Sequence, residues 1–370
     1  MSALSLYIHI PYCAKKCAYC DFPSYTGKMG TARAYIGRVL REAEEKRIPG
    51  REISTLYIGG GTPSLLPPAV MKELLSGLKE RFTFEKGAEC SSEANPGMLS
   101  DKMAYTLAEG GINRVSLGLQ AVQPRLLSVL GRLHTFEDAE RSVKRLREAG
   151  ITNLNLDVMF GLPGQTVNDF RETLEAALSL SPRHLSCYAL IAEEGTEITR
   201  RIRSGELSLP DEDEEREMYS LAKAETAARG MRQYEISNFA LPGFECRHNV
   251  LCWQRREYLG LGAAACGFTG DTRCRNPVTV EGYLAGEKAE EETISPREAR
   301  FESMMLGLRM NEGVSREAFY QMHGLTPEQA FGEKLIQALE SGLLEEENGY
   351  FRPTERGMDL QNRLLLMLMD

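Results

Sequence analysis

The sequence predicts an α/β protein in which helices pack outside a parallel β-sheet. Apolar, strand-like stretches and amphipathic, helix-like stretches alternate six times within the first 190 residues. Polar or glycine-rich residues follow each strand-like stretch, where a parallel α/β fold places its functional site. Such alternation is typical of βαβ units. From this pattern alone, a doubly wound sheet and a partial barrel both remain open.

The expected elements can be placed along the chain by their periodicity. Ser100 and Thr166 are candidate N-cap residues, and Gly150 ends a helix. Strands are expected at 4–10, 55–58, 89–93, 114–119, 154–159 and 184–190. Helices are expected at 31–46, 67–81, from 101, 124–130, 136–149, 167–180 and 211–228.

Four segments are expected: a barrel-type unit over 1–200, a segment that completes it over 201–285, a charged linker over 286–298 and a C-terminal domain over 299–370. The C-terminal segment reads as helices followed by a hairpin with Gly349 in its turn, which predicts an α+β, winged-helix-like domain. Lys and Arg are sparse in its third helix, so packing or partner docking is expected there rather than DNA binding. Its helices are expected at 302–308, 316–323 and 327–341, and its strands at 343–346 and 350–353.

Composition and charge restrict the class of protein. The 370 residues are long for one domain and sufficient for a large core. The net charge of −9 argues against nucleic acid as the main partner. The N-terminus has neither a basic region nor a long apolar run, and no stretch reaches the length of a membrane span. A cytoplasmic location is therefore expected.

Cys13, Cys17 and Cys20 lie on one short loop after the first strand. Three thiolates suit a soft metal or an iron–sulfur cluster, and on a four-iron cubane they leave one iron free to bind a ligand. A disulfide is disfavoured because the nine cysteines are an odd number and nothing suggests secretion. A structural zinc site remains an alternative, since Cys17 and Cys20 have the usual pair spacing and His9 could add a ligand.

The ends of the later strands carry further candidate residues. Gly59–Thr62 exposes backbone without a Cβ, although a tight turn explains it equally well. Glu93 and Asp157 could accept hydrogen bonds from a ligand, or could cap the following helices. Gln120 and the Tyr188–Ala189 pair complete the set. Parallel strands bring these groups to one edge, so together they predict a functional site there.

The spacing Cys-x-x-x-Cys-x-x-Cys resembles the signature of the radical S-adenosylmethionine (SAM) enzymes. The preceding stretch, residues 6–13 (Leu-Tyr-Ile-His-Ile-Pro-Tyr-Cys), is similar to the branch that contains oxygen-independent coproporphyrinogen III oxidase and the HemW haem chaperones. The resemblance covers nearly the whole chain. It implies a partial (β/α)6, TIM-like barrel, with a [4Fe–4S] cluster on the three cysteines and SAM on the open iron.

The resemblance also implies roles for individual residues. A first SAM would contact Tyr19, Gly60, Gly61, Thr62 and Glu93. A second SAM would contact Gln120, Arg132, Asp157 and Ala189, although the sequence does not decide whether one or two molecules bind. The substrate or haem would lie beside Tyr7 and a motif formed by His248, Asn249 and Trp253, in which Cys252 replaces a tyrosine. From the residues alone, this stretch is better explained as a packed turn with His248 bonded to backbone.

Within this branch, the sequence favours a haem chaperone that passes haem to a haem-requiring protein and also uses an electron donor. Phe22 stands where the oxidase has a fourth cysteine, and only six residues precede Tyr7, where the oxidase has an extension. Coproporphyrinogen III oxidase and a radical SAM methyltransferase are the alternatives, so the sequence leaves open whether the protein is an enzyme. It also leaves monomer and homodimer open.

Overall fold

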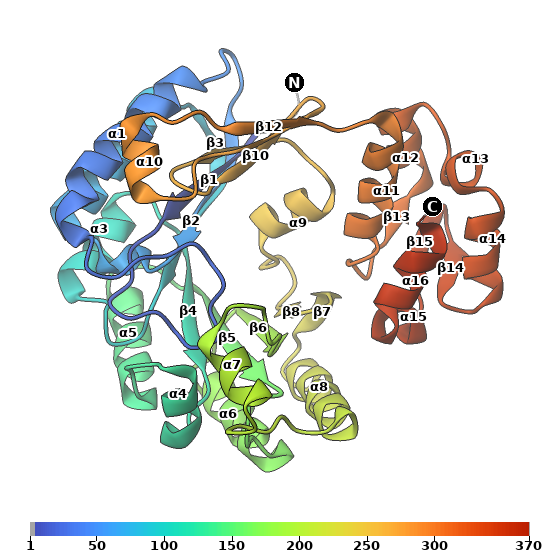
Figure 1. Cartoon of the computed structure of the whole chain (residues 1–370), viewed down its shortest axis with the longest axis horizontal. Helices are drawn as coiled ribbons and strands as arrows, with labels where there is room; N and C mark the ends of the chain where they lie inside the picture. The colour runs from blue at the N-terminus through green and yellow to red at the C-terminus, as the bar shows by residue number, and fades with distance from the viewer. Residues whose placement is uncertain (1–3, 370) are drawn as a thin grey trace.

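The computed structural model describes residues 4–369, and its centre is a curved sheet of six parallel strands. These strands pair in chain order and, with helices outside them, form a partial barrel (Figure 1). The predicted fold class is confirmed, with the barrel rather than the doubly wound sheet. The strands are β1 (Leu4–Ile10), β2 (Ile53–Gly60), β3 (Phe84–Ala94), β4 (Arg114–Gln120), β5 (Asn153–Phe160) and β6 (His184–Ala189).

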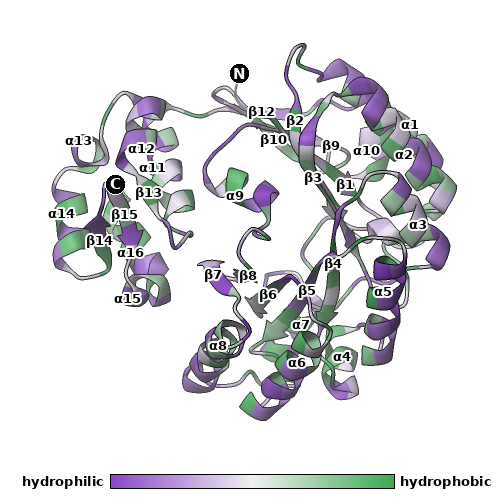
Figure 2. Ribbon diagram, turned by 180° about the vertical axis from the view of Figure 1, so that it is seen from behind, coloured by the Kyte–Doolittle hydropathy of each residue, from purple (hydrophilic) through white to green (hydrophobic). Residues whose placement is uncertain are grey.

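The outer face of the barrel is apolar because alternate strand residues turn toward the helices. Leu6 and Ile8 of β1, for example, are fully buried in the main core. The outward surfaces of the helices are largely hydrophilic (Figure 2). Ser100 and Thr166 cap their helices as expected, each accepting a hydrogen bond from a backbone N–H three residues on. The covering helices are α1 (Ala32–Glu45), α2 (Pro68–Arg81), α3 (Asp101–Glu109), α4 (Pro124–Leu130), α5 (Phe136–Glu148) and α6 (Val167–Ser179), with short 3-10 turns η1 (Met29–Thr31) and η2 (Pro63–Leu65).

Additional strands extend the sheet at both edges. A parallel strand, β9 (Tyr258–Leu261), pairs with β1 and continues into β10 (Cys266–Thr269), β11 (Thr272–Arg275) and β12 (Glu290–Thr293), which are antiparallel. Beyond β6 lies the hairpin of β8 (Asn238–Ala240) and β7 (Arg232–Glu235). The prediction of a linker over 286–298 is therefore wrong, because this segment contains β12 and the start of a helix. An exposed edge strand buries no side chains, so its sequence lacks apolar alternation.

Three helices accompany these additions. The long helix α8 (Glu212–Ala227) was expected, whereas α7 (Glu197–Arg203) was not. The third, α9 (Arg247–Trp253), occupies a stretch that reads in sequence as a packed turn; it lies between the barrel and the C-terminal domain (Figure 1). Its N-terminus is fixed by Glu89 of β3, whose carboxylate accepts hydrogen bonds from the backbone N–H groups of Arg247 (3.0 Å) and His248 (3.1 Å).

The C-terminal part has its own core and a three-stranded sheet in the order β13–β15–β14. The helix expected over 327–341 is two helices, because Gly332 has a positive φ of 53°. In residues 4–369, no helix combines the length and apolarity that crossing a membrane requires. The elements are α10 (Val280–Ala285), α11 (Pro296–Gly307), β13 (Val314–Ser315), α12 (Arg316–His323), α13 (Pro327–Phe331), α14 (Glu333–Glu340), β14 (Leu344–Glu347), β15 (Tyr350–Pro353), α15 (Glu355–Asp359) and α16 (Gln361–Leu368).

Candidate functional site

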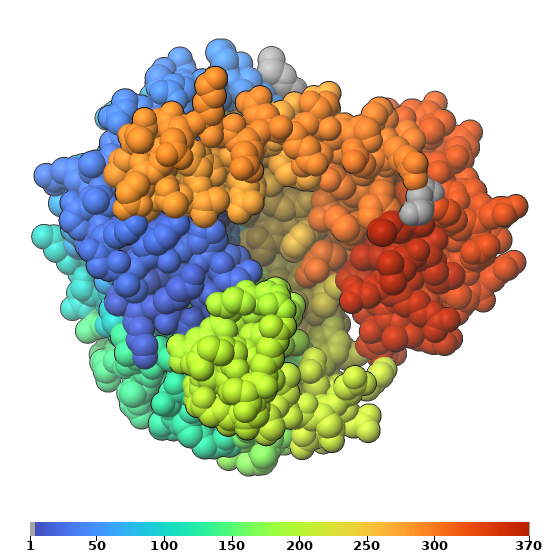
Figure 3. All heavy atoms as spheres, in the orientation of Figure 1, coloured from blue at the N-terminus to red at the C-terminus, as the bar shows by residue number. Residues whose placement is uncertain are grey.

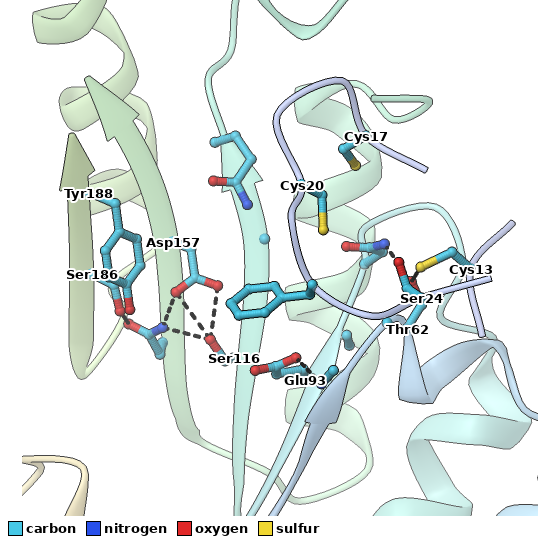
Figure 4. A pocket seen from close by; sticks show the side chains of 18 of the residues that line it. Cys13, Cys17, Cys20, Ser24, Thr62, Glu93, Ser116, Asp157, Ser186 and Tyr188 are labelled. Atoms are coloured by element: carbon cyan, nitrogen blue, oxygen red, sulfur yellow. Dashed lines mark hydrogen bonds between the residues drawn. The ribbon is translucent and has the colours of Figure 1, made fainter. Parts of the chain in front are cut away.

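The inner face of the barrel is polar. Strand register aligns inward-facing positions across neighbouring strands, so that Gly118 lies beside Asp157 and Asp157 beside Ser186. Toward the carboxyl ends of the strands, polar side chains surround a cavity of about 400 Å³ (Figure 4). In the space-filling view, a hollow separates the segment around residue 200 from the C-terminal domain (Figure 3). Polar strand residues that line the cavity include Tyr57, Glu93, Arg114, Ser116, Gln120, Asn155, Asp157, Ser186 and Tyr188.

All three cysteines of the first loop line this cavity, and none forms a disulfide. The Thr62 hydroxyl donates to Cys13 Sγ at 3.8 Å, and Arg132 Nη1 donates to Cys17 Sγ at 3.5 Å. Within residues 4–369, no three His, Cys, Asp or Glu side chains are close enough to share one metal ion. The thiols therefore stand apart around the cavity instead of meeting at a single point, and a cubane likewise binds its cysteines through separate irons.

The glycine run brings backbone close to the cysteine loop. A Cβ on Gly61 would lie 2.7 Å from the Tyr12 carbonyl oxygen and 3.0 Å from Cys13 Sγ. Gly60 has a positive φ of 109°, and a Cβ there would meet the His9 ring at 2.6 Å. Both positions require glycine because a side chain has no room. The run is therefore more than a turn, since Gly61 is fitted against Cys13 and Gly60 against His9.

Glu93 accepts hydrogen bonds from the Tyr57 hydroxyl and the Gly60 N–H, both at 3.1 Å. Burial, aided by the nearby Asp157, raises the pKa of Glu93 to about 7. The following helix is capped by Ser100 instead. The interpretation of Glu93 as a helix cap is therefore excluded, and its carboxyl group faces the cavity.

Asp157 is held by a network that sequence reasoning missed. It accepts hydrogen bonds from Ser116 Oγ at 3.0 Å and Asn155 Nδ2 at 2.7 Å, and burial raises its pKa. Asn155 is oriented in turn by His184, whose Nδ1 lies 2.6 Å from its Oδ1. Asp157 does not cap a helix, because Thr166 caps α6. The available signal was Asn155, a polar residue two positions before Asp157 on the same strand face.

The remaining residues expected around SAM have different positions. Tyr19, Gln120 and Arg132 line the cavity, and Gln120 has a φ of 67°, which is uncommon for a residue other than glycine. Arg132 also donates a hydrogen bond to the Gly118 carbonyl oxygen. Ala189 ends β6 beside Phe160 and does not line the cavity.

The four residues expected around haem gather only in part: the rings of Tyr7 and His248 have centroids 6.5 Å apart, whereas Asn249 and Trp253 line different cavities. Tyr7 lies in the barrel interior, where its hydroxyl is 3.0 Å from His9 Nδ1. Asn249 lines the main cavity. Trp253, at the end of α9, faces the C-terminal domain, with Arg309 4.5 Å from its ring centroid. It lines a second cavity of about 190 Å³.

His248, the fourth of these residues, is buried in the barrel. Its ring stacks on Tyr57, with centroids 5.2 Å apart, and its Nδ1 lies 3.0 Å from Thr55 Oγ1. The Thr55 hydroxyl donates to Ser5, so this network assigns the proton to Nδ1 of His248 and leaves a lone pair on Nε2. Burial lowers the pKa of His248 to about 4, and the imidazole is therefore neutral at pH 7.

Comparison with known proteins identifies the family. Residues 7–177 match the radical SAM superfamily and residues 294–360 match the HemN C-terminal domain. Heme chaperone HemW of Lactococcus lactis is 37% identical over 364 residues, covering 97% of this chain and 96% of that protein. HemW of Bacillus subtilis is 36% identical, with 97% of both chains covered, and HemW of Escherichia coli is 34% identical over 99% and 98%. The chain belongs to the HemW family.

This HemW family member shares its fold with a radical SAM enzyme of known structure. Coproporphyrinogen III oxidase (HemN) from Escherichia coli superposes with a TM-score of 0.87 over 99% of this chain and 90% of the enzyme. The two sequences are 24% identical, so this likeness concerns the fold.

Family membership implies SAM and a [4Fe–4S] cluster, and the residues that line the cavity suit both groups. Three free thiols face it without a fourth cysteine beside them. Gly60 and Gly61 keep Cβ atoms out of the space next to Cys13. Arg132 donates a hydrogen bond to Cys17 Sγ, which places a positive charge beside this sulfur.

Proposed function

We propose that this protein is a haem chaperone: it binds haem, a [4Fe–4S] cluster and SAM, and delivers haem to haem-dependent proteins. The observation that carries the proposal is the identity of 34–37% to proteins named heme chaperone HemW over nearly the full length of both chains. The cavity at the carboxyl ends of the strands supports the cofactor part of the proposal.

Cys13, Cys17 and Cys20 would hold the cluster. When bound, the cluster supplies an iron that can hold SAM and pass one electron to it. The chain contributes the thiolates, the space beside Gly61 and the hydrogen bonds to sulfur from Thr62 and Arg132. Hydrogen bonds to the sulfur ligands tune an iron–sulfur cluster, so both donors bear on its potential.

We assign the SAM contacts as the family resemblance implies them. Tyr19, Gly60, Gly61, Thr62 and Glu93 would bind the first molecule, and the carboxylate of Glu93 suits an ammonium group. A second molecule would lie against Gln120, Arg132, Asp157 and Ala189. The assignment is supported by the cavity lining, which includes every one of these residues except Ala189.

Haem would bind near Tyr7, His248, Asn249 and Trp253. The lone pair on Nε2 of His248 supports a ligand role, because a histidine that binds a metal commonly has its other nitrogen held by a hydrogen bond. The ring is 5% exposed, so this role requires the space around Nε2 to open. An unaltered haem spectrum and affinity in His248→Ala would remove His248 as a ligand.

Coproporphyrinogen III oxidase is the second candidate function, favoured by the fold shared with HemN. Against it, Phe22 occupies the position of the oxidase's fourth cysteine, and its ring is 61% exposed beside the cavity. A radical SAM methyltransferase would use the same cluster and SAM contacts. We further propose the division into 1–200, 201–285 and 299–370, a cytoplasmic location, and an electron donor and a haem acceptor as partners.

One anaerobic experiment tests the proposal. Reconstituted protein should hold four irons per chain, bind haem, and leave coproporphyrinogen III unchanged in the presence of SAM and a reductant. The Cys13→Ala/Cys17→Ala/Cys20→Ala variant should lose the iron and sulfide. Protoporphyrinogen IX in the mass spectrum would reverse the assignment in favour of the oxidase, and unchanged iron in the triple variant would remove the cluster assignment.

A further inference from the structure

One buried, charged side chain at the cavity has no role in the site described above. Arg114 begins β4, lines the cavity and is 2% exposed. Its Nε has no hydrogen-bond partner, and within residues 4–369 no carboxylate forms an ion pair with its guanidinium. A buried guanidinium normally satisfies its donors, because an unpaired buried charge costs several kcal/mol. Arg114 therefore stands out as a donor without an acceptor.

The carboxylates near Arg114 accept hydrogen bonds from other groups of the protein. Glu89 accepts the N–H groups at the start of α9, Glu93 accepts from Tyr57 and Gly60, and Asp157 accepts from Ser116 and Asn155. They balance the charge of Arg114 at longer range but do not use its hydrogen bonds. An acceptor supplied from outside the chain would do so, and a planar guanidinium binds a carboxylate through two parallel hydrogen bonds.

The position of Arg114 within the barrel defines where such an acceptor would lie. Arg114 pairs in register with Ser91 and Asn153, whereas Ser116, two residues later, pairs with Glu93 and Asn155. Arg114 is thus one layer further from the cysteine loop than Glu93, at the floor of the cavity. A ligand group that reaches it must pass the polar ring formed by Glu93, Ser116 and Asp157.

The rim of the same cavity carries exposed aromatic rings, in contrast to its polar floor. The rings of Phe22 and Tyr188 both line it and are 61% and 39% exposed. A cavity of about 400 Å³ is near the lower end of the range for small-molecule sites, so it suits one arm of a larger ligand. An apolar rim above a buried cation matches a molecule with an apolar body and an acidic arm.

We propose that Arg114 forms a carboxylate-binding subsite at the floor of the barrel cavity, which receives an acidic arm while the ligand's body stays at the Phe22–Tyr188 rim. The proposal rests on the proposed function for its ligands, which are the propionate of haem or the amino-acid carboxylate of SAM. Both present the same group, and the apolar rim favours the propionate.

The test compares ligands with and without the carboxylate. Haem and its dimethyl ester, and SAM and decarboxylated SAM, are titrated anaerobically into wild-type, Arg114→Met and Arg114→Lys protein. Arg145→Met, on the outer helix α5, serves as the matched control. We expect Arg114→Met to weaken one acid ligand about 10- to 100-fold, the range for a hydrogen bond to a charged group. Its decarboxylated or esterified counterpart should bind wild type and variant equally.

If Arg114→Met weakens haem but not its dimethyl ester, the carboxylate comes from haem. If it weakens SAM but not decarboxylated SAM, the carboxylate comes from SAM. Arg114→Lys keeps the positive charge but loses the two parallel hydrogen-bond donors of the guanidinium, so it should bind the acid ligand with intermediate affinity. This variant replaces Arg114→Met if Arg114→Met fails to fold. The proposal is overturned if acid and neutral ligands weaken by the same factor, or if neither weakens. If the wild type binds no haem, the chaperone function fails, whereas the SAM pair still tests the subsite.

Discussion

Glu93 and Asp157 are the two carboxyl groups of the cavity, and burial raises the pKa of both. For Glu93 the value of about 7 lies close to physiological pH. A carboxyl group is neutral below its pKa and charged above it, so the charge at the proposed SAM site changes between pH 6 and 8. Asp157 contributes to this shift, because two nearby carboxylates disfavour each other's ionisation.

We predict that SAM binds more tightly as pH rises from about 5 to 7, because its ammonium group prefers ionised Glu93 and stays protonated in this range. Below the pKa, affinity should change by up to about 10-fold per pH unit. Glu93→Gln should flatten this dependence and bind with the weak affinity that wild type has at low pH. Isothermal titration of the reconstituted protein measures both, and Glu73→Gln, on the surface helix α2, is the control. A slope that persists in Glu93→Gln would contradict the assignment.

At the scale of elements, the site depends on how closely the loop after β2, with Gly61 and Thr62, fits the loop that carries Cys13, Cys17 and Cys20. Gly61 donates its N–H to the Ile10 carbonyl oxygen, and Thr62 to that of Tyr12, both at 2.8 Å. On its other side, the cysteine loop is held by Ala18, whose N–H donates to Leu130 and whose carbonyl accepts from Ile198 of α7. The loop is thus fixed between the β2 loop, α4 and α7.

Gly61→Ala should displace the cysteine loop, because the added Cβ meets backbone at 2.7 Å and backbone cannot rotate away. We expect less iron per chain after reconstitution and a lower melting temperature. Gly37→Ala is the matched control: it lies in α1, and its Cβ would meet only the Arg41 side chain, at 3.8 Å. It should stabilise the fold by about 0.5–1 kcal/mol. Full iron content in Gly61→Ala would show that the loops are less tightly fitted.

At the scale of the whole molecule, the sheet and the C-terminal domain meet around one buried acid. Glu235 at the end of β7 is fully buried and forms an ion pair with Arg309 at 3.2 Å. Its other oxygen accepts the Ser237 N–H at 2.9 Å. Arg309 also stacks on Trp253, so one side chain links the barrel, α9 and the C-terminal domain.

Arg309→Met should therefore destabilise the protein by about 1–3 kcal/mol, because it leaves a buried carboxylate without its cation. Arg216→Met removes another contact between the barrel and the C-terminal domain, the exposed pair with Asp359, and should cost less than about 1 kcal/mol. Urea unfolding measures both. Equal losses in the two variants would mean that burial of Glu235 does not matter.

Much of the fold was predictable because its signals are local. The six strand-and-helix units follow from periodicity, and capping residues such as Ser100 fix helix ends. The elements that were missed depend on distant contacts: α9 is seven residues long and is held by Glu89, more than 150 positions earlier. The strand β12 exists only because β11 lies beside it.

The candidate site was likewise predictable only in part. The residues at strand ends, such as Glu93 and Asp157, could be found because a polar group after an apolar strand is conspicuous. Ser116, which pairs in register with Glu93, and Arg114, one layer deeper, could not, because this requires knowing that the sheet curves into a barrel with a polar interior. The expected haem residues show the same limit: within α9, His248 packs on Tyr57 and Asn249 lines the main cavity, whereas Trp253 faces the C-terminal domain.

The strand β12, which forms one edge of the large sheet, affects how the protein behaves in concentrated solution. Three of its four residues are glutamates, and all four are exposed. An unpaired strand edge is a template onto which another chain can add, and a row of like charges opposes that addition. The acidic edge should therefore keep two copies from joining edge to edge into a continuous, aggregating sheet.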